Sequence, residues 1–363
     1  MKAAVCREFG QPLQIEDLTL ANPEQGEVRV KLAACAICHS DLTFMEGGWG
    51  GTLPVVLGHE AAGFVTATGP GVAAISIGDP VLVTLMRSCG HCLSCEKGES
   101  YVCGTAFPID QEGRLTTASG EKVGQGLKTG GFAEEVVVDQ SQLVVIPKTL
   151  PLDAASLLSC GVITGLGAVV NTAKVEYGAS VVVIGCGGVG LNSIQGATLV
   201  SANPIIALDL VETKLQAAKE FGATHVINPL ANDANDKVKE LTNGRGADYV
   251  FVAAGSPKAF EQGLELLAPS GTLVIVGMPP TGQKISVEAG NIAGAGQKIL
   301  GSKMGSTRLR IDIPKLVALY EAGRLKLDEL ITGRYALDDI NEAIAEVRAD
   351  RALRNVIIFG ENT

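Results

Sequence analysis

Hydrophobic and polar positions follow two different patterns, which meet near residue 180. The first 150 residues are divided by glycine and proline into short runs rich in β-branched residues. Short strands between turns are typical of an all-β barrel or sandwich whose loops carry function. The predicted strands cover 27–32, 63–68, 79–84, 135–139 and 143–147. Residues 99–131, rich in Gly, Thr, Ser and Lys, are interpreted as one long excursion of a functional or mobile kind.

Beyond residue 180, apolar runs alternate with helical patterns. Strands are predicted over 181–184, 204–209, 225–228, 249–252, 271–276 and 298–301. Helices are predicted after the glycine-rich turn at 185–190, over 211–221, and near 235–242 and 258–267. This alternation predicts parallel βαβ units in a doubly wound sheet, and hence an α/β protein. Two amphipathic helices, 313–322 and 338–348, and a strand, 355–359, follow.

Length and composition restrict the classes of protein that fit. A chain of 363 residues suggests two domains, and 46% hydrophobic residues exclude disorder. The net charge of −10, without a block of five like charges, argues against nucleic acid or an anionic membrane as a partner. Residues 177–208 carry no charge, but glycines, asparagines and a proline interrupt them, so we do not interpret them as a membrane span.

Nine cysteines are present, and no apolar core of a secretory signal follows Met1-Lys2. We therefore expect a cytoplasmic protein in a reducing compartment. Clustered cysteines in that setting bind metal or perform redox chemistry.

The segment Gly185-Cys-Gly-Gly-Val-Gly190 follows a predicted strand and opens a helix. Asp209 ends the next strand, 19 residues beyond Gly190. In this context the glycines indicate a dinucleotide site, with the phosphates at the helix N-terminus and Asp209 on the adenosine ribose. The carboxylate would repel a 2′-phosphate, which favours NAD over NADP. The alternative is a purely structural glycine turn.

Four cysteines lie within fifteen residues, in the spacing Cys89-x2-Cys92-x2-Cys95-x7-Cys103. Four thiolates can close a tetrahedral shell around Zn²⁺, which is typical of a structural site. An iron–sulfur cluster is the competing interpretation.

A third set of residues is dispersed: Cys38-His-Ser-Asp41, Gly58-His-Glu60 and Cys160. Two cysteines and one histidine make a catalytic zinc shell with a free fourth position, although spacing alone does not show that they converge. Cys35-x2-Cys38 is a poor thioredoxin-like pair because no βαβ pattern surrounds it.

Taken together, the three sets resemble the zinc-dependent medium-chain alcohol dehydrogenases over the whole chain. Other segments carry the same resemblance: Met1-Lys-Ala-Ala-Val5, Leu57-Gly-His-Glu-Ala-Ala-Gly63 and Val274-Ile-Val-Gly-Met-Pro-Pro280. The resemblance implies a GroES-like β-barrel catalytic domain, residues 1–161 completed by 303–363. It also implies an NAD-binding Rossmann domain, residues 162–302.

The resemblance further implies two zinc ions per chain. The catalytic zinc would be held by Cys38, His59 and Cys160, with Glu60 just behind it, and the structural zinc by Cys89, Cys92, Cys95 and Cys103. Ser40 would take the substrate proton. The implied NAD contacts are His39 and Arg354 on the pyrophosphate, Thr164 and Val189 at the nicotinamide, Lys214 at a ribose or phosphate beyond Asp209, and the glycines Gly185, Gly187, Gly188 and Gly190.

Two departures from the family pattern, at Thr43 and Phe107, concern the proton and the substrate. Thr43 stands where several members have a histidine that relays the proton outward. Phe107 stands where glutathione-dependent formaldehyde dehydrogenases carry an arginine, and Cys160 argues against the polyol dehydrogenases. Trp49 and Leu85 fall at pocket-lining positions, although such residues are equally typical of barrel core.

We therefore expect an NAD-dependent zinc enzyme that oxidises a primary, apolar, aromatic or allylic alcohol to its aldehyde, and the reverse. The alternatives are a dehydrogenase of thiol adducts such as S-hydroxymethyl glutathione or mycothiol, an enzyme with permanently held nicotinamide, and an inactive binding or structural member. A homodimer is the expected assembly, with a tetramer as the second choice. Part of the reason is the exposed edge that strand 298–301 would otherwise leave.

Overall fold

The computed structural model describes residues 1–230 and 233–360. These residues form two compact units. Unit 1 comprises Met1–Cys160 and the segment from Arg308 onward, and unit 2 comprises Gly161–Thr307.

Unit 1 is built on two sets of strands. A closed barrel has the order β1-β2-β7-β8-β4, with β1 (Lys2–Cys6), β2 (Gln14–Leu20), β4 (Val55–Val56), β7 (Leu115–Thr117) and β8 (Lys122–Gln125). A second sheet has the order β10-β6-β5-β3-β18-β17, and β9 also pairs with β3. Its strands are β3 (Glu27–Ala36), β5 (Glu60–Thr68), β6 (Pro80–Thr84), β9 (Glu135–Asp139), β10 (Leu143–Val145), β17 (Ile331–Ala336) and β18 (Arg354–Ile358). The predicted β-barrel domain is confirmed, although the strands predicted at 27–32, 63–68, 79–84, 135–139 and 143–147 all lie in the second sheet. The sequence pattern missed the five strands of the closed barrel, which are two to seven residues long.

The helices of unit 1 connect and cover these strands. They are α1 (His39–Met45), α2 (Leu93–Glu96), α3 (Pro108–Glu112), α4 (Leu152–Leu157), α11 (Leu309–Glu321) and α12 (Ile340–Arg348). Short 3₁₀ turns are η1 (Ser100–Val102), η2 (Gly126–Lys128), η3 (Gln140–Gln142), η6 (Asp328–Leu330) and η7 (Leu337–Asp339).

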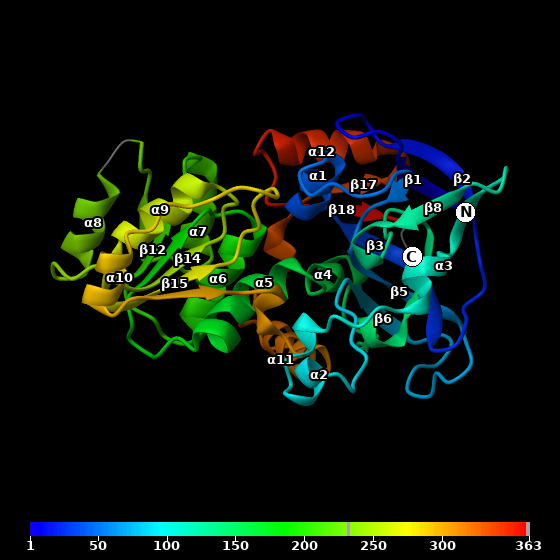
Figure 1. The fold of residues 1–363 in the computed structure, drawn as a ribbon, viewed down its shortest axis with the longest axis horizontal. Coiled ribbons are helices and arrows are strands. Elements are labelled where there is room, and N and C mark those ends of the chain that lie inside the picture. Colours follow the sequence, from blue (N-terminus) through cyan, green and yellow to red (C-terminus); the bar gives the residue numbers. More distant parts are fainter. Residues whose placement is uncertain (231–232, 361–363) are drawn as a thin grey trace. The chain divides into compact units, whose positions relative to one another are not determined.

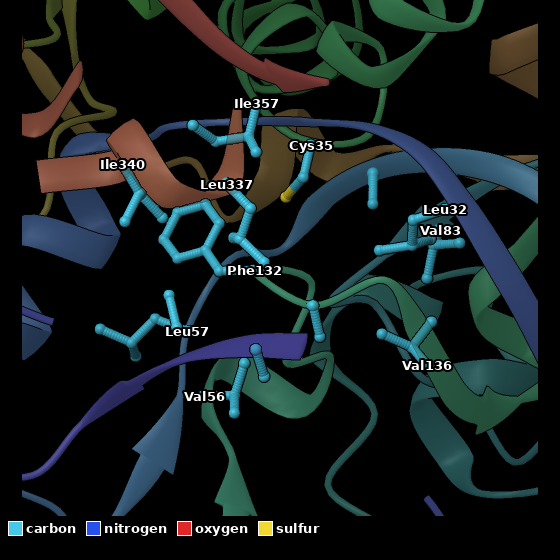
Figure 2. Close-up of a cluster of buried hydrophobic side chains, with 14 of the residues drawn as sticks. Leu32, Cys35, Val56, Leu57, Val83, Phe132, Val136, Leu337, Ile340 and Ile357 are labelled. Atoms are coloured by element: carbon cyan, nitrogen blue, oxygen red, sulfur yellow. The ribbon is translucent and has the colours of Figure 1, made fainter. Parts of the chain in front are cut away.

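The core of unit 1 is apolar and brings distant segments together. Figure 2 shows Phe132 among Leu57, Leu337 and Ile340, which come from a barrel loop and the C-terminal segment. Cys35 lies in the same cluster and is fully buried. Its thiol is therefore a core group, which explains why the pair Cys35-x2-Cys38 makes no redox motif.

The excursion 99–131 is more ordered than its composition suggested, because it contains α3 and contributes β7 and β8 to the barrel. Arg114, which is 4% exposed, anchors it. The guanidinium donates through Nε and Nη2 to the two carboxylate oxygens of Glu27 on β3, at 2.8 and 2.7 Å. A buried, bidentate ion pair of this kind fixes the segment to the sheet.

Unit 2 is a parallel sheet of six strands with the order β13-β12-β11-β14-β15-β16. Its strands are β11 (Val181–Ile184), β12 (Ile205–Leu208), β13 (His225–Ile227), β14 (Ala247–Val252), β15 (Leu267–Ile275) and β16 (Lys298–Gly301). Figure 1 shows β12, β14 and β15 of this sheet with helices around it; β11 lies between β12 and β14. The sequence of strands runs outward in opposite directions from the boundary between β11 and β14. Doubly wound sheets bind ligands at this point. The predicted Rossmann sheet is confirmed.

The helices of unit 2 are α5 (Gly161–Gly167), α6 (Gly188–Leu199), α7 (Glu212–Glu220), α8 (Ala234–Leu241), α9 (Pro257–Glu265) and α10 (Ala289–Ala295). A π-helical turn, η4 (Ala168–Ala173), follows α5, and a 3₁₀ turn, η5 (Met304–Ser306), lies near the end of the unit. Among the described residues, no helix combines the length and the apolar character that a membrane crossing requires.

Candidate active site and metal centres

Two candidate metal ligands lie at neighbouring strand ends. Cys38 follows β3 and caps α1, while His59 immediately precedes β5. Strands β3 and β5 are antiparallel, with Ala36 opposite Glu60. The end of one strand therefore lies beside the start of the other, although the two residues are twenty-one positions apart in the sequence.

Asp41 holds these two ligands together. Its carboxylate accepts hydrogen bonds from the backbone nitrogens of Cys38, at 3.1 Å, and Gly58, at 2.9 Å. The Nδ1 atom of His59 lies 3.0 Å from Oδ1 of the same carboxylate, so His59 donates through Nδ1 and presents Nε2. Gly58 has a φ of 86°, and a Cβ there would meet the backbone nitrogen of Phe132 at 2.6 Å, so glycine is required at this turn.

Cys160 completes the cluster from a distant part of the chain. It follows the turn after α4, and that helix packs against β3 and β5. The ligand atoms of Cys38, His59, Glu60 and Cys160 all lie within 4.8 Å of one another, and all four residues are buried. The structure thus brings the dispersed set together within unit 1.

The donor set fits a zinc ion. The Nε2 atom of His59 is buried and has no hydrogen-bonding partner among the described residues. Such an atom is costly unless a further group binds it. The hydrogen bond between the two thiols lowers the pKa of Cys38 and raises that of Cys160. Two thiols and one imidazole nitrogen are ligands that Zn²⁺ prefers, and three protein ligands leave a position for substrate.

Glu60 and Arg354 form a buried ion pair beside this cluster. Nη2 of Arg354, at the start of β18, lies 2.5 Å from Oε2 of Glu60. The other oxygen of Glu60 and the Nε atom of Arg354 are buried without a partner among the described residues. Burial raises the pKa of Glu60 to about 7, although the Arg354 guanidinium acts in the opposite direction. The family resemblance implies a contact of Arg354 with the cofactor pyrophosphate; within the protein, its guanidinium contacts Glu60.

The four cysteines of residues 89–103, a segment called the lobe below, form a second cluster. The sulfur atoms of Cys89, Cys92, Cys95 and Cys103 lie within 4.8 Å of one another. Backbone N–H groups of Cys89 and Cys92 donate to sulfurs of the set, at 3.4 and 3.3 Å. Amide donors to sulfur stabilise thiolates, so the lobe fits a closed structural zinc.

Thr105 adds a side-chain donor that the sequence analysis missed. Its hydroxyl donates to the sulfur of Cys89 at 3.1 Å. This hydrogen bond is the main reason why the pKa of Cys89 is lowered to about 5. A threonine two residues beyond the last cysteine is too ordinary a signal to be recognised in a sequence.

In unit 2, the glycine-rich turn joins β11 to α6. A Cβ on Gly190 would lie 1.8 Å from the carbonyl oxygen of Gly185, so only glycine allows the helix to start so close to the strand. By contrast, nothing lies within 4 Å of the Cβ position of Gly187, the N-cap of α6. Open space before a helix N-terminus without an acidic first turn suits a pyrophosphate.

Asp209 follows β12 and lies against this turn. Its carboxylate accepts from the backbone nitrogens of Cys186, at 2.6 Å, and Val211, at 2.9 Å. Other predicted cofactor residues occupy nearby elements of unit 2: Gly188 and Val189 in the first turn of α6, Lys214 in α7 and Thr164 in α5. In unit 1, His39 is exposed and Ser40 is half-buried in the first turn of α1.

Comparison with known proteins agrees with both units. The model of the alcohol dehydrogenase GroES-like domain matches residues 24–148, and that of the zinc-binding dehydrogenase matches residues 188–322. An S-(hydroxymethyl)glutathione dehydrogenase of Paracoccus denitrificans is 34% identical over 99% of both chains. The chain belongs to the zinc-dependent alcohol dehydrogenases of the medium-chain family.

Two further relatives extend this comparison. An NDMA-dependent alcohol dehydrogenase of Amycolatopsis methanolica is 35% identical over 98% of both chains. The crystal structure of a benzyl alcohol dehydrogenase from Acinetobacter calcoaceticus has a TM-score of 0.92, with 33% identity over 99% of both chains. The family is thus represented by relatives named for alcohols and for a glutathione adduct.

The hydroxyl of Thr43 forms a hydrogen bond within its own helix, α1. Its hydroxyl donates to the backbone carbonyl of His39 at 3.0 Å. We therefore expect Thr43→Val to lower kcat less than threefold, because threonine does not hold a proton as imidazole does. The pH profile of alcohol oxidation, with and without added buffer, checks this. A loss above tenfold that buffer rescues would show that Thr43 relays the proton.

From the negative charge of Asp209 we expect a preference for NAD over NADP. Asp209→Asn keeps an acceptor for the backbone N–H groups but removes the negative charge. It should lower kcat/KM with NAD by about tenfold or more, because hydrogen bonds from the ribose to a charged carboxylate are stronger than those to a neutral amide. It should also improve use of NADP by relieving like-charge repulsion. The ratio of kcat/KM for the two cofactors measures this. A wild-type ratio that favours NADP would contradict the assignment.

Proposed function

We propose that this chain oxidises a primary apolar alcohol, aromatic or allylic, to the aldehyde, with hydride transfer to NAD, and catalyses the reverse reaction. The observation that carries the proposal is the buried cluster of Cys38, His59 and Cys160, in which His59 presents an unpartnered Nε2. A zinc ion held there supplies a Lewis acid that favours the deprotonated alcohol and polarises the aldehyde carbonyl.

The side chains around the cluster have separate tasks in this proposal. Ser40, two residues after Cys38, takes the substrate proton and passes it outward. Asp41 keeps His59 in the tautomer that offers Nε2. Asp209 and the turn at 185–190 hold the adenosine end of NAD, and the cofactor itself performs the redox step.

Features of unit 1 support an apolar substrate. Trp49 and Leu85 are only half-buried, so they are available to line a pocket. The ring of Phe107 lies 5.2 Å from the guanidinium carbon of Arg87. The nitrogens of Arg87 already donate to Gln142, Asp110 and the carbonyl of Lys128. That guanidinium is therefore committed, and does not replace an arginine that would bind the carboxylate of a thiol adduct.

A thiol-adduct dehydrogenase is the second candidate, because relatives at 34% and 36% identity are named S-(hydroxymethyl)glutathione dehydrogenases. A panel of benzyl, cinnamyl, short primary and secondary alcohols, with formaldehyde adducts of glutathione and mycothiol, distinguishes the two through NADH formation at 340 nm. We expect the highest kcat/KM for the aromatic or allylic alcohols. Preference for an adduct would establish the second candidate. Absorbance at 340 nm without added NAD would show a permanently held nicotinamide.

The described cysteines are all free thiols, nine in total. Six of them belong to the two clusters, and in our proposal those clusters bind two zinc ions per chain. Free thiols of this kind persist in a reducing compartment, so we place the enzyme in the cytoplasm.

For the assembly we propose a homodimer, with a tetramer as the second choice. Strand β16 is the edge of the sheet in unit 2, and Ile299 on it is 37% exposed. An open edge of this kind pairs readily with a second copy of itself. One chain has a mass of 37.4 kDa, and light scattering should give twice that mass. A monomer would reject both assemblies.

A further inference from the structure

Cys160 reaches the metal cluster by a different route from Cys38 and His59. Those two lie at adjoining strand ends. The Asp41 carboxylate accepts hydrogen bonds from the backbone nitrogen of Cys38 and from Nδ1 of His59. Cys160 follows α4, about a hundred positions after His59 in the sequence. Its place in the cluster therefore depends on contacts other than those of Asp41.

Ser159, the residue just before Cys160, takes part in two buried hydrogen bonds, one through its backbone carbonyl and one through its own hydroxyl. Oγ1 of Thr84 donates to the carbonyl oxygen of Ser159 at 2.7 Å, and Oγ of Ser159 donates to the carbonyl oxygen of Ala61 at 3.1 Å. Thr84 and Ser159 are both 0% exposed. Thr84 ends β6, directly opposite Glu60 on β5. The segment that carries Cys160 is thus tied to the strand that begins beside His59.

The first of these hydrogen bonds acts on the backbone of Cys160 itself. The carbonyl group of Ser159 and the nitrogen and Cα of Cys160 belong to one planar peptide unit. Fixing that carbonyl leaves φ and χ1 of Cys160 as the torsions that place its sulfur. The hydroxyl of Thr84 accepts from the backbone nitrogen of Met86 at 3.4 Å, which directs its proton toward Ser159.

Thr84 is itself held from the other side. Its carbonyl accepts from Nε2 of Gln142 at 2.7 Å. The Oε1 atom of Gln142 accepts in turn from Nε of Arg87 at 2.8 Å. All three residues are buried, so the donor that fixes the Ser159 carbonyl stands on a rigid base.

We propose that Thr84 and Ser159 are positioning residues that place the sulfur of Cys160 against Cys38 and His59 for the catalytic metal. This inference rests on the zinc role proposed above. Loss of either hydroxyl leaves a buried carbonyl without its donor and lets the Cys160 segment shift. Groups that support a ligand in this way typically contribute 10–100-fold to metal affinity, and we expect a change of about that size at this site alone.

The test uses the full-length zinc protein and four variants. Thr84→Val keeps the shape of the side chain and removes the hydroxyl, Ser159→Ala removes the second donor, and Thr84→Ser keeps the hydroxyl. The matched control is Thr66→Val on β5, whose hydroxyl donates to the exposed carbonyl of Arg29 at 3.4 Å. Zinc per chain is measured against a series of competing chelator concentrations. Cobalt-exchanged protein then reports thiolate ligation through its charge-transfer absorption.

We expect two zinc ions in the wild type, one of which binds about 10–100-fold more weakly in Thr84→Val and Ser159→Ala. The cobalt charge-transfer band of that site should shift or lose intensity. Thr84→Ser and Thr66→Val should behave as the wild type. If Thr84→Val does not fold, the comparison of Ser159→Ala with Thr84→Ser decides in the same way.

Two failures are distinguishable. A wild type that binds zinc only in the lobe, so that Cys103→Ser binds none, would overturn the proposed catalytic metal. A wild type with two zinc ions, whose affinities change less than twofold in both hydroxyl variants, would overturn the positioning role. In that case the two hydroxyls would serve only to satisfy buried carbonyls.

Discussion

Replacing Ser40 by alanine should lower kcat for alcohol oxidation by about 10²–10⁴-fold, the usual contribution of a positioned proton-transfer group. Ser40 lies in the first turn of α1, two residues after Cys38, and is half-buried. No other hydroxyl is placed at the metal cluster by the family motif. The zinc content and the affinity for NAD should stay unchanged, because Ser40 belongs to neither set of ligands. Steady-state rates, zinc analysis and NAD titration measure the three quantities.

Ser40→Thr is the matched control for this prediction. It keeps the hydroxyl and adds a methyl group, so its kcat should stay within about tenfold of the wild type. A Ser40→Ala enzyme that retains more than a tenth of the wild-type kcat would show that the proton leaves by another group. Equal losses in both variants would point to packing in α1 instead of proton transfer.

The second large effect concerns the lobe. Cys103→Ser should abolish zinc binding there and lower the free energy of unfolding by about 4 kcal/mol or more, since structural zinc binding contributes directly to folding. At roughly 2–4 °C per kcal/mol for units of 150–250 residues, this corresponds to a drop in Tm of about 10 °C. Calorimetry and zinc analysis of the same preparation provide the measurement.

Cys6→Ser is the matched control for the lobe variant. Cys6 is buried at 1% exposure in β1 and belongs to neither cluster, so the same change of thiol to hydroxyl should leave two zinc ions per chain. Loss of activity in Cys103→Ser with an unchanged Tm would contradict a structural role for the lobe. Iron in the freshly purified protein would instead indicate that the four cysteines bind an iron–sulfur cluster.

The parts of the molecule that sequence predicts best are those encoded locally. The strand 181–184 and the glycine turn that follows it are a continuous signal, and β11 has the predicted limits. The lobe cysteines are likewise close in sequence, so one turn of chain brings them together. The sequence pattern predicted none of the closed-barrel strands: β1, with its two alanines, lacks the alternation that marks a strand, and β4, β7 and β8 are only two to four residues long.

The dispersed cluster shows where sequence spacing is insufficient. Whether Cys38 meets His59 depends on the register that sets Ala36 opposite Glu60, and a shift of one residue would turn the side chains to the other face. The supporting groups are harder still to foresee. Asp41, three residues after Cys38, occupies an ordinary capping position, and Thr84 and Ser159 act through backbone carbonyls that no motif records.

The most direct test of the proposed reaction follows the hydrogen itself. The best alcohol of the panel is prepared with two deuterium atoms on its carbinol carbon and is incubated with NAD and the zinc protein. We predict reduced cofactor that is one mass unit heavier than NADH, together with an aldehyde that retains the other deuterium. Cofactor reduced without deuterium, or no reduction by any alcohol of the panel in a protein that holds two zinc ions, would contradict hydride transfer at this site.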